Sequence, residues 1–89
     1  MAAVVELSHD DDCIGVMPQL PLTPVLRPHL MELFDSLPPY KDIDGLSSGF
    51  MGAYLTEQID FLGATPQAVL TLLDEYGYGD LKGKKVSIV

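Results

Sequence analysis

A proline-rich segment, residues 18–24 (PQLPLTP), places the strongest constraint on what this chain can fold into. Its three prolines lack the amide hydrogen that helices and central strands use, and each fixes one backbone φ angle. The segment is therefore predicted to be a rigid, extended loop. It separates a short apolar run, residues 13–17, from the helical patterns that follow.

Three helices are predicted from apolar spacing and from residues that favour helix ends. Residues 1–8 are mostly good helix formers and lead into a polar exit. Pro28 suits the first turn of a helix over residues 28–37, and two further prolines end it. Residues 46–58 carry apolar side chains at helical spacing, although two glycines weaken this helix.

A fourth helix has the clearest pattern and is predicted over residues 65–77. Thr65 is a favourable N-cap, Pro66 suits the first helical position, and Gly77 is typical of a helix end. Four apolar side chains then repeat with the spacing of one helix face: Val69, Leu72, Leu73 and Tyr76.

Two strands complete the predicted order. Residues 13–17 form an apolar run too short for a helix, and it is interpreted as a buried strand that begins at Cys13. Residues 84–89 are rich in β-formers and end fully apolar. Alternation of helices and strands predicts an α/β fold, in which parallel strands need neighbouring strands and covering helices. With only two strands, the chain is expected to be a segment of a longer protein.

Composition and charge exclude several kinds of partner. The net charge of −8 disfavours binding to nucleic acid or to anionic membranes. No apolar stretch approaches the roughly 20 residues of a membrane-spanning helix. The single cysteine, Cys13, forbids an intrachain disulfide and fits a reducing compartment, so a cytoplasmic location is expected. His9 and the three following aspartates lack a metal-ligand spacing and are interpreted as a solvated acidic loop, with no metal site expected.

Three motifs in register resemble those of the bifunctional methylenetetrahydrofolate dehydrogenase/methenyltetrahydrofolate cyclohydrolase family. Residues 15–22 (GVMPQLPL) are similar to the family's G-I-L-V-Q-L-P-L, and residues 39–46 (PYKDIDGL) to its P-x-K-D-V-D-G-[FL]. Residues 64–86 contain counterparts of its T-P, Y-G and L-x-G-K-x-V elements. The chain departs from the family pattern where Phe50 stands near an expected Asn and where Gly63 begins the counterpart of Pro-Cys.

The resemblance implies a domain organisation as well as a fold class. Residues 1–63 would be the C-terminal part of a three-layer α/β, folate-binding catalytic domain. Residues 64–77 would be the interdomain helix, and residues 78–89 the start of a Rossmann-type NAD(P)-binding domain. The chain would stop before that domain's glycine-containing phosphate loop.

Two residues are candidates for the folate site. From the Asp-Gly pattern alone, Asp44 is interpreted as a turn residue whose carboxylate caps nearby amides. The resemblance instead implies that Asp44 binds substrate, its two oxygens accepting hydrogen bonds from the pterin ring. Gln19 alone is typical of an exposed loop residue, whereas the resemblance implies a catalytic role in which its amide orients a lysine. That lysine belongs to a Tyr-x-x-x-Lys motif that this chain does not contain.

The activity implied by the resemblance is oxidation of 5,10-methylenetetrahydrofolate with NADP as hydride acceptor, followed by hydrolysis to 10-formyltetrahydrofolate. A homodimer is implied for the longer protein. The 89 residues alone are expected to be inactive, because the resemblance places the nucleotide loop outside them. Two alternatives remain open: a catalytically inactive acidic interaction module derived from the same scaffold, and a segment without an independent stable fold.

Overall fold

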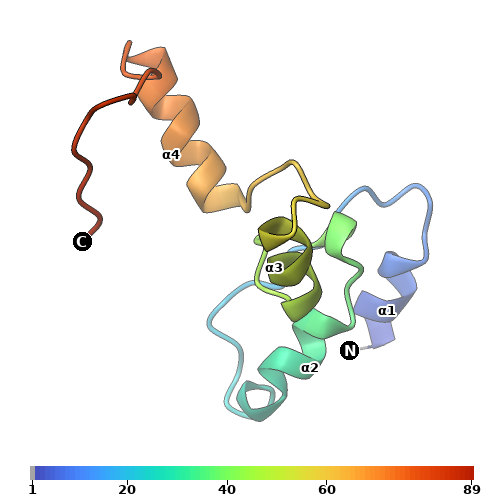
Figure 1. Ribbon diagram of the computed structural model, residues 1–89. Coiled ribbons are helices and arrows are strands. Elements are labelled where there is room, and N and C mark those ends of the chain that lie inside the picture. The colour runs from blue at the N-terminus through green and yellow to red at the C-terminus, as the bar shows by residue number, and fades with distance from the viewer. Residues whose placement is uncertain (1) are drawn as a thin grey trace.

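The computed structural model describes residues 2–89, and Figure 1 shows an all-helical chain over that range. Two short 3₁₀ turns accompany the α-helices. In chain order the elements are α1 (Ala2–Ser8), η1 (Arg27–His29), α2 (Leu30–Asp35), η2 (Pro39–Lys41), α3 (Ser48–Leu55) and α4 (Ala64–Glu75).

The core lies between α2, η2 and α3, which pack against one another. Phe34 is 0% exposed, and Leu33, Leu37 and Phe50 are also buried. The Phe50 ring stacks with Tyr54, at a centroid separation of 6.2 Å. This core is small, as expected for a chain of this length.

Helix α1 is joined to the core by a lysine. Lys41 is almost fully buried, and its Nζ donates to the carbonyl oxygens of Asp10 (2.7 Å) and Leu7 (3.4 Å). The carbonyls at the end of a helix lack donors within the helix. A buried ammonium group there donates to these carbonyls, so its own hydrogen-bonding need is met as well. Lys41 thereby links the end of α1 to η2.

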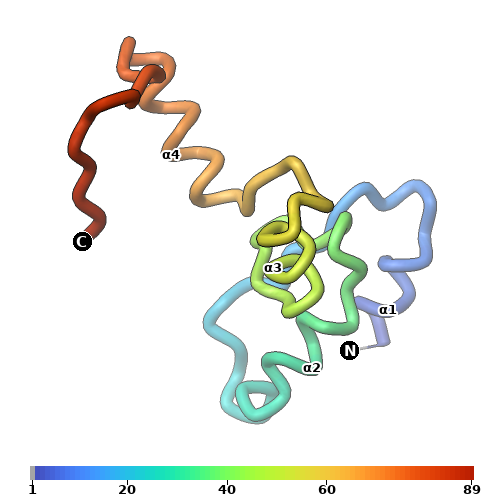
Figure 2. Tube along the Cα trace, in the orientation of Figure 1, coloured from blue at the N-terminus to red at the C-terminus, as the bar shows by residue number. Residues whose placement is uncertain are grey.

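Helix α4 and the residues after it extend away from this core, as the trace in Figure 2 shows. No α4 residue is buried, and apolar side chains such as Val69 and Leu72, together with the C-cap Tyr76, are largely exposed. Beyond the helix the chain turns at residues 76–77 and 82–83 and forms no further helix or strand to residue 89. The C-terminal quarter therefore adds little to the packing of the core.

The four predicted helices are confirmed with adjusted ends. The first is seen over Ala2–Ser8, with Met1 outside the described residues, and the second corresponds to η1 followed by α2. The third is shorter than predicted, because α3 ends at Leu55. The fourth begins at Ala64 with Gly63 as its N-cap, so the prediction that Thr65 caps it is wrong.

The predicted strands, and with them the α/β class for this chain taken alone, are not seen. Residues 2–89 contain no strand, and the only ladder contact described is an isolated parallel bridge between Val16 and Asp42. Ile14 is 92% exposed, which also overturns the prediction of a buried first strand, and Ile88 in the second predicted strand is 96% exposed. A strand needs a neighbour to satisfy its amides and carbonyls, and these segments find at most one bridging residue.

Candidate functional site

The site begins where two sequence motifs meet. The Val16 amide donates to the Lys41 carbonyl at 2.8 Å, and the Ile43 amide donates to the Val16 carbonyl at 3.4 Å. Gly15 allows this approach, because a Cβ there would lie 2.7 Å from the Ile43 side chain. The first and second motifs thus run parallel and in contact, although more than twenty residues separate them in sequence.

Asp42 holds the turn that follows this bridge. Its side chain is 1% exposed, and its carboxylate accepts hydrogen bonds from the Gly45 amide (3.0 Å) and the Ser47 amide (2.8 Å). Gly45 has a φ of +70°, a conformation that glycine adopts readily and other residues rarely do. The turn therefore depends on both the Asp42 carboxylate and the glycine.

The start of α3 is capped by two further side chains. Ser47 is the N-cap, and its Oγ accepts from the Phe50 amide at 3.1 Å. Asp35, from the end of α2, accepts from the Ser48 amide (2.8 Å) and the Ser48 hydroxyl (3.1 Å). These caps satisfy amides that the helix itself leaves unpaired and so stabilise a helix whose glycines weaken it.

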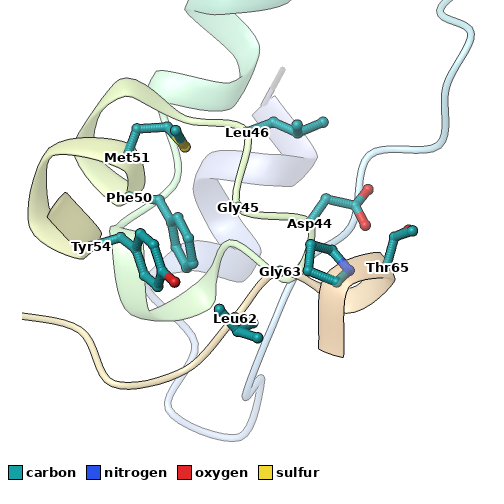
Figure 3. Close-up of a pocket in the computed structure, with 10 residues that line it drawn as sticks. Asp44, Gly45, Leu46, Phe50, Met51, Tyr54, Leu62, Gly63 and Thr65 are labelled. Carbon is teal, nitrogen blue, oxygen red and sulfur yellow. The ribbon is translucent and has the colours of Figure 1, made fainter. Parts of the chain in front are cut away.

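An apolar cavity of about 500 Å³ lies between α3 and the start of α4. Its lining includes Phe50, Tyr54 and Leu62, and Asp44 is among the lining residues. Figure 3 shows the Asp44 carboxylate on the side of Thr65, away from the two aromatic rings. Within residues 2–89 that carboxylate has no hydrogen-bond or ion-pair partner, so both of its oxygens are available to a ligand.

The start of α4 is tied to the same turn. The Ala64 amide donates to the Ile43 carbonyl at 2.9 Å, and a Cβ on Gly63 would overlap the Asp44 carbonyl oxygen. Glycine at position 63, one of the departures from the family pattern, is therefore required by this close approach. The cavity wall and the Asp44 backbone are fixed relative to each other by this contact.

Gln19 lies outside the cavity. Its side chain is exposed, and Nε2 donates to the Leu20 carbonyl at 3.0 Å. Gln19 and Asp44 follow the Val16–Asp42 bridge in the same direction along two parallel segments. The carboxyl-terminal side of such a pair is where ligand-binding loops of parallel sheets gather, but the structure does not bring Gln19 into the cavity that Asp44 lines.

Sequence reasoning missed the residues that shape this turn. It considered Asp44 as the amide-capping aspartate, whereas Asp42 takes that role. An aspartate three residues before a glycine, and a serine just before an apolar helical run, are signals that could have identified Asp42 and Ser47. The contribution of Tyr54 and Leu62 to the cavity depends on tertiary packing and has no local signal.

Other candidate groups form no further site in the described part of the chain. Residues 2–89 contain no cluster of three or more His, Cys, Asp or Glu side chains placed to hold a metal ion. Cys13 is half-buried, and its Sγ donates to the Gly15 carbonyl at 3.4 Å. Among these residues there is also no helix with the length and apolar character needed to cross a bilayer.

Comparison with known proteins identifies the relatives of this chain. It is 35% identical over all 89 residues to Bifunctional protein FolD of Lactobacillus gasseri, of which it covers 30%. It is 30% identical over 89 residues to the protein of the same name from an Acidovorax species, of which it covers 31%. The chain is related to one segment of the FolD proteins. The family resemblance seen in the three motifs is thereby confirmed.

The matches to FolD proteins have a consistent length. A Hydrogenobaculum FolD is 35% identical over 88 residues and is covered to 31%. The chain thus spans about 30% of the length of the curated relatives it matches. No family model matches the chain, and no solved structure matches it.

Proposed function

We propose that this chain is the folate-binding segment of a bifunctional methylenetetrahydrofolate dehydrogenase/methenyltetrahydrofolate cyclohydrolase. The observation that carries the proposal is the similarity to FolD proteins along the whole chain, combined with a free Asp44 carboxylate beside an apolar cavity. The longer protein would oxidise methylenetetrahydrofolate and hydrolyse the methenyl product in the cytoplasm, as a homodimer.

Asp44 is the residue we propose to bind the pterin ring. A carboxylate can accept two hydrogen bonds from the adjacent ring nitrogen and exocyclic amino group of a pterin. The Asp44 carboxylate has no competing partner in the described chain, and the cavity that Asp44 lines is largely apolar, which favours a flat ring. Gln19 would act outside this cavity, orienting a lysine of the longer protein.

The residues described here do not fit a dinucleotide. Gly77, Gly79 and Gly83 are followed by residues that form no helix, whereas a dinucleotide-binding turn leads into the N-terminus of a helix. We propose that the remainder of the longer protein would bind NADP. In that protein residues 1–63 would complete an α/β catalytic domain, α4 would connect domains, and residues 78–89 would begin the Rossmann-type domain.

One observation favours the alternative of an interaction module. Val69, Leu72 and Tyr76 form an exposed apolar row on α4, and soluble proteins seldom leave such a row uncovered. A module of this kind would use α4 for binding and would have no affinity for folate. A measurement of folate binding therefore distinguishes the folate-binding segment from the interaction module.

Titration of the full chain with tetrahydrofolate, followed by calorimetry, tests the proposal. We expect saturable binding that Asp44→Asn weakens by about tenfold or more, because a hydrogen bond to a charged group contributes roughly 1.5–3 kcal/mol. Asp60→Asn is the matched control, since Asp60 is an exposed aspartate that does not line the Asp44 cavity. Absence of saturable binding, or equal weakening by both substitutions, would overturn the proposal.

A further inference from the structure

Two aspartates only two residues apart have opposite surroundings. Asp42 is buried, and each of its carboxylate oxygens accepts a backbone amide hydrogen bond. Asp44 is half-exposed at the cavity, with no partner in residues 2–89. A carboxylate that is removed from water needs such donors to offset the loss of hydration, so the Asp42 side chain has little freedom to move.

The bonds of Asp42 enclose the backbone of Asp44. The two donors, the Gly45 and Ser47 amides, follow Asp44 in the chain, while the Asp42 backbone is anchored by its bridge to Val16. Asp44 therefore lies inside a loop that is closed at both ends by hydrogen bonds. Its carbonyl side is further limited by the close approach of Gly63.

We infer that Asp42 is a positioning residue for the ligand of Asp44. Its carboxylate holds the Asp44 turn in the conformation that presents the Asp44 carboxylate beside the cavity. Asp42 itself does not touch the ligand. This inference rests on the proposed function, because the ligand in question is the folate of that proposal.

Asp42→Asn is the direct test in the full chain. The asparagine side chain keeps one acceptor oxygen, but its NH2 group cannot accept a hydrogen bond, so one of the two bonds from the backbone amides is lost. Asp35→Asn is a matched control, because Asp35 also accepts two hydrogen bonds at the start of α3 but lies outside the Asp44 turn. We expect Asp42→Asn to weaken tetrahydrofolate binding about tenfold and the control to leave it nearly unchanged.

A double-mutant cycle separates positioning from general stabilisation. If Asp42 acts through Asp44, its substitution weakens binding in the parent chain but has no further effect in the Asp44→Asn background. Additive losses would overturn the inference, as would equal effects of Asp42→Asn and Asp35→Asn. The cycle thus distinguishes positioning of Asp44 from a purely structural role of Asp42.

Amide hydrogen exchange gives a readout that needs no ligand. We expect the Gly45 and Ser47 amides to exchange faster in Asp42→Asn than in the parent chain. Unchanged exchange, with Asp44→Asn still weakening tetrahydrofolate, would overturn this inference and leave the proposed function intact. Faster exchange without any tetrahydrofolate binding would instead overturn the proposed function and, with it, the ligand assigned here.

A second pair of variants applies if Asp42→Asn does not fold. Ser47→Pro removes one amide donor and keeps the Asp42 carboxylate, and the φ of −71° at Ser47 suits proline. Both Ser47→Pro and Ser47→Ala lose the Ser47 hydroxyl, but Ser47→Ala retains the backbone amide donor. Weaker tetrahydrofolate binding by the proline variant than by the alanine variant supports positioning, and equal binding contradicts it.

Discussion

Replacing Gly45 by alanine tests whether the turn depends on glycine in the way the structure indicates. The φ of +70° costs an L-residue roughly 1–2 kcal/mol. The new Cβ would also lie 2.7 Å from Cε1 of Phe50, a buried ring in contact with Phe61. Overpacking of this kind costs about 1–3 kcal/mol. The reduced freedom of the unfolded chain returns about 0.4–1 kcal/mol, so the free energy of unfolding should fall by about 2–4 kcal/mol.

Gly52→Ala is the matched control in the same region. Gly52 lies inside α3, and a Cβ there would meet no atom within 4 Å. Alanine should therefore raise the free energy of unfolding by about 0.5–1 kcal/mol. Urea unfolding followed by far-ultraviolet circular dichroism measures both changes through the midpoint. A Gly45→Ala midpoint at or above that of the parent chain, or a shift of both variants in the same direction, would refute the reasoning.

Two further substitutions test the contacts around the turn. Ser47→Ala removes the N-cap hydrogen bond to the Phe50 amide and should lower the free energy of unfolding by about 1 kcal/mol in urea, while an unchanged midpoint would contradict the cap. Lys41→Met keeps the length of the side chain but leaves the Asp10 and Leu7 carbonyls without their donor. It should cost about 1–3 kcal/mol and increase the exchange of α1 amides, and protection of α1 equal to that of the parent would show that Lys41 does not anchor it.

The helices could be predicted because their signals are local. The apolar spacing over α4 and the prolines around α2 are properties of neighbouring residues, so they identify helices without knowledge of the fold. The residue at which α4 starts was predicted less accurately than the helix itself. Its N-cap is displaced from Thr65 to Gly63, because the Ala64 amide bonds to the Ile43 carbonyl and Gly63 packs against the Asp44 backbone.

The absence of the two predicted strands could not be foreseen from the sequence, because a strand forms only where a neighbouring segment pairs with it. Residues 13–17 and 84–89 have the composition of strands, but composition does not supply a neighbouring segment in register. Only Val16 finds a parallel partner, at Asp42. In the longer FolD relatives, about 70% of the length has no counterpart in this chain, which is where we expect the remaining strands of a sheet to come from.

The division of roles between Asp42 and Asp44 could not be predicted from their sequence. In an extended segment, residues two apart point to the same face, so both aspartates would have equal surroundings. Asp42 is extended, but the chain bends at residues 43 and 44, and the left-handed Gly45 then brings two backbone amides to the Asp42 carboxylate. One carboxylate is consequently buried against amides and the other stays free beside the cavity. A substitution that straightens the turn at Gly45 should therefore remove the distinction between them, which is why the stability of this glycine turn and the availability of Asp44 are coupled.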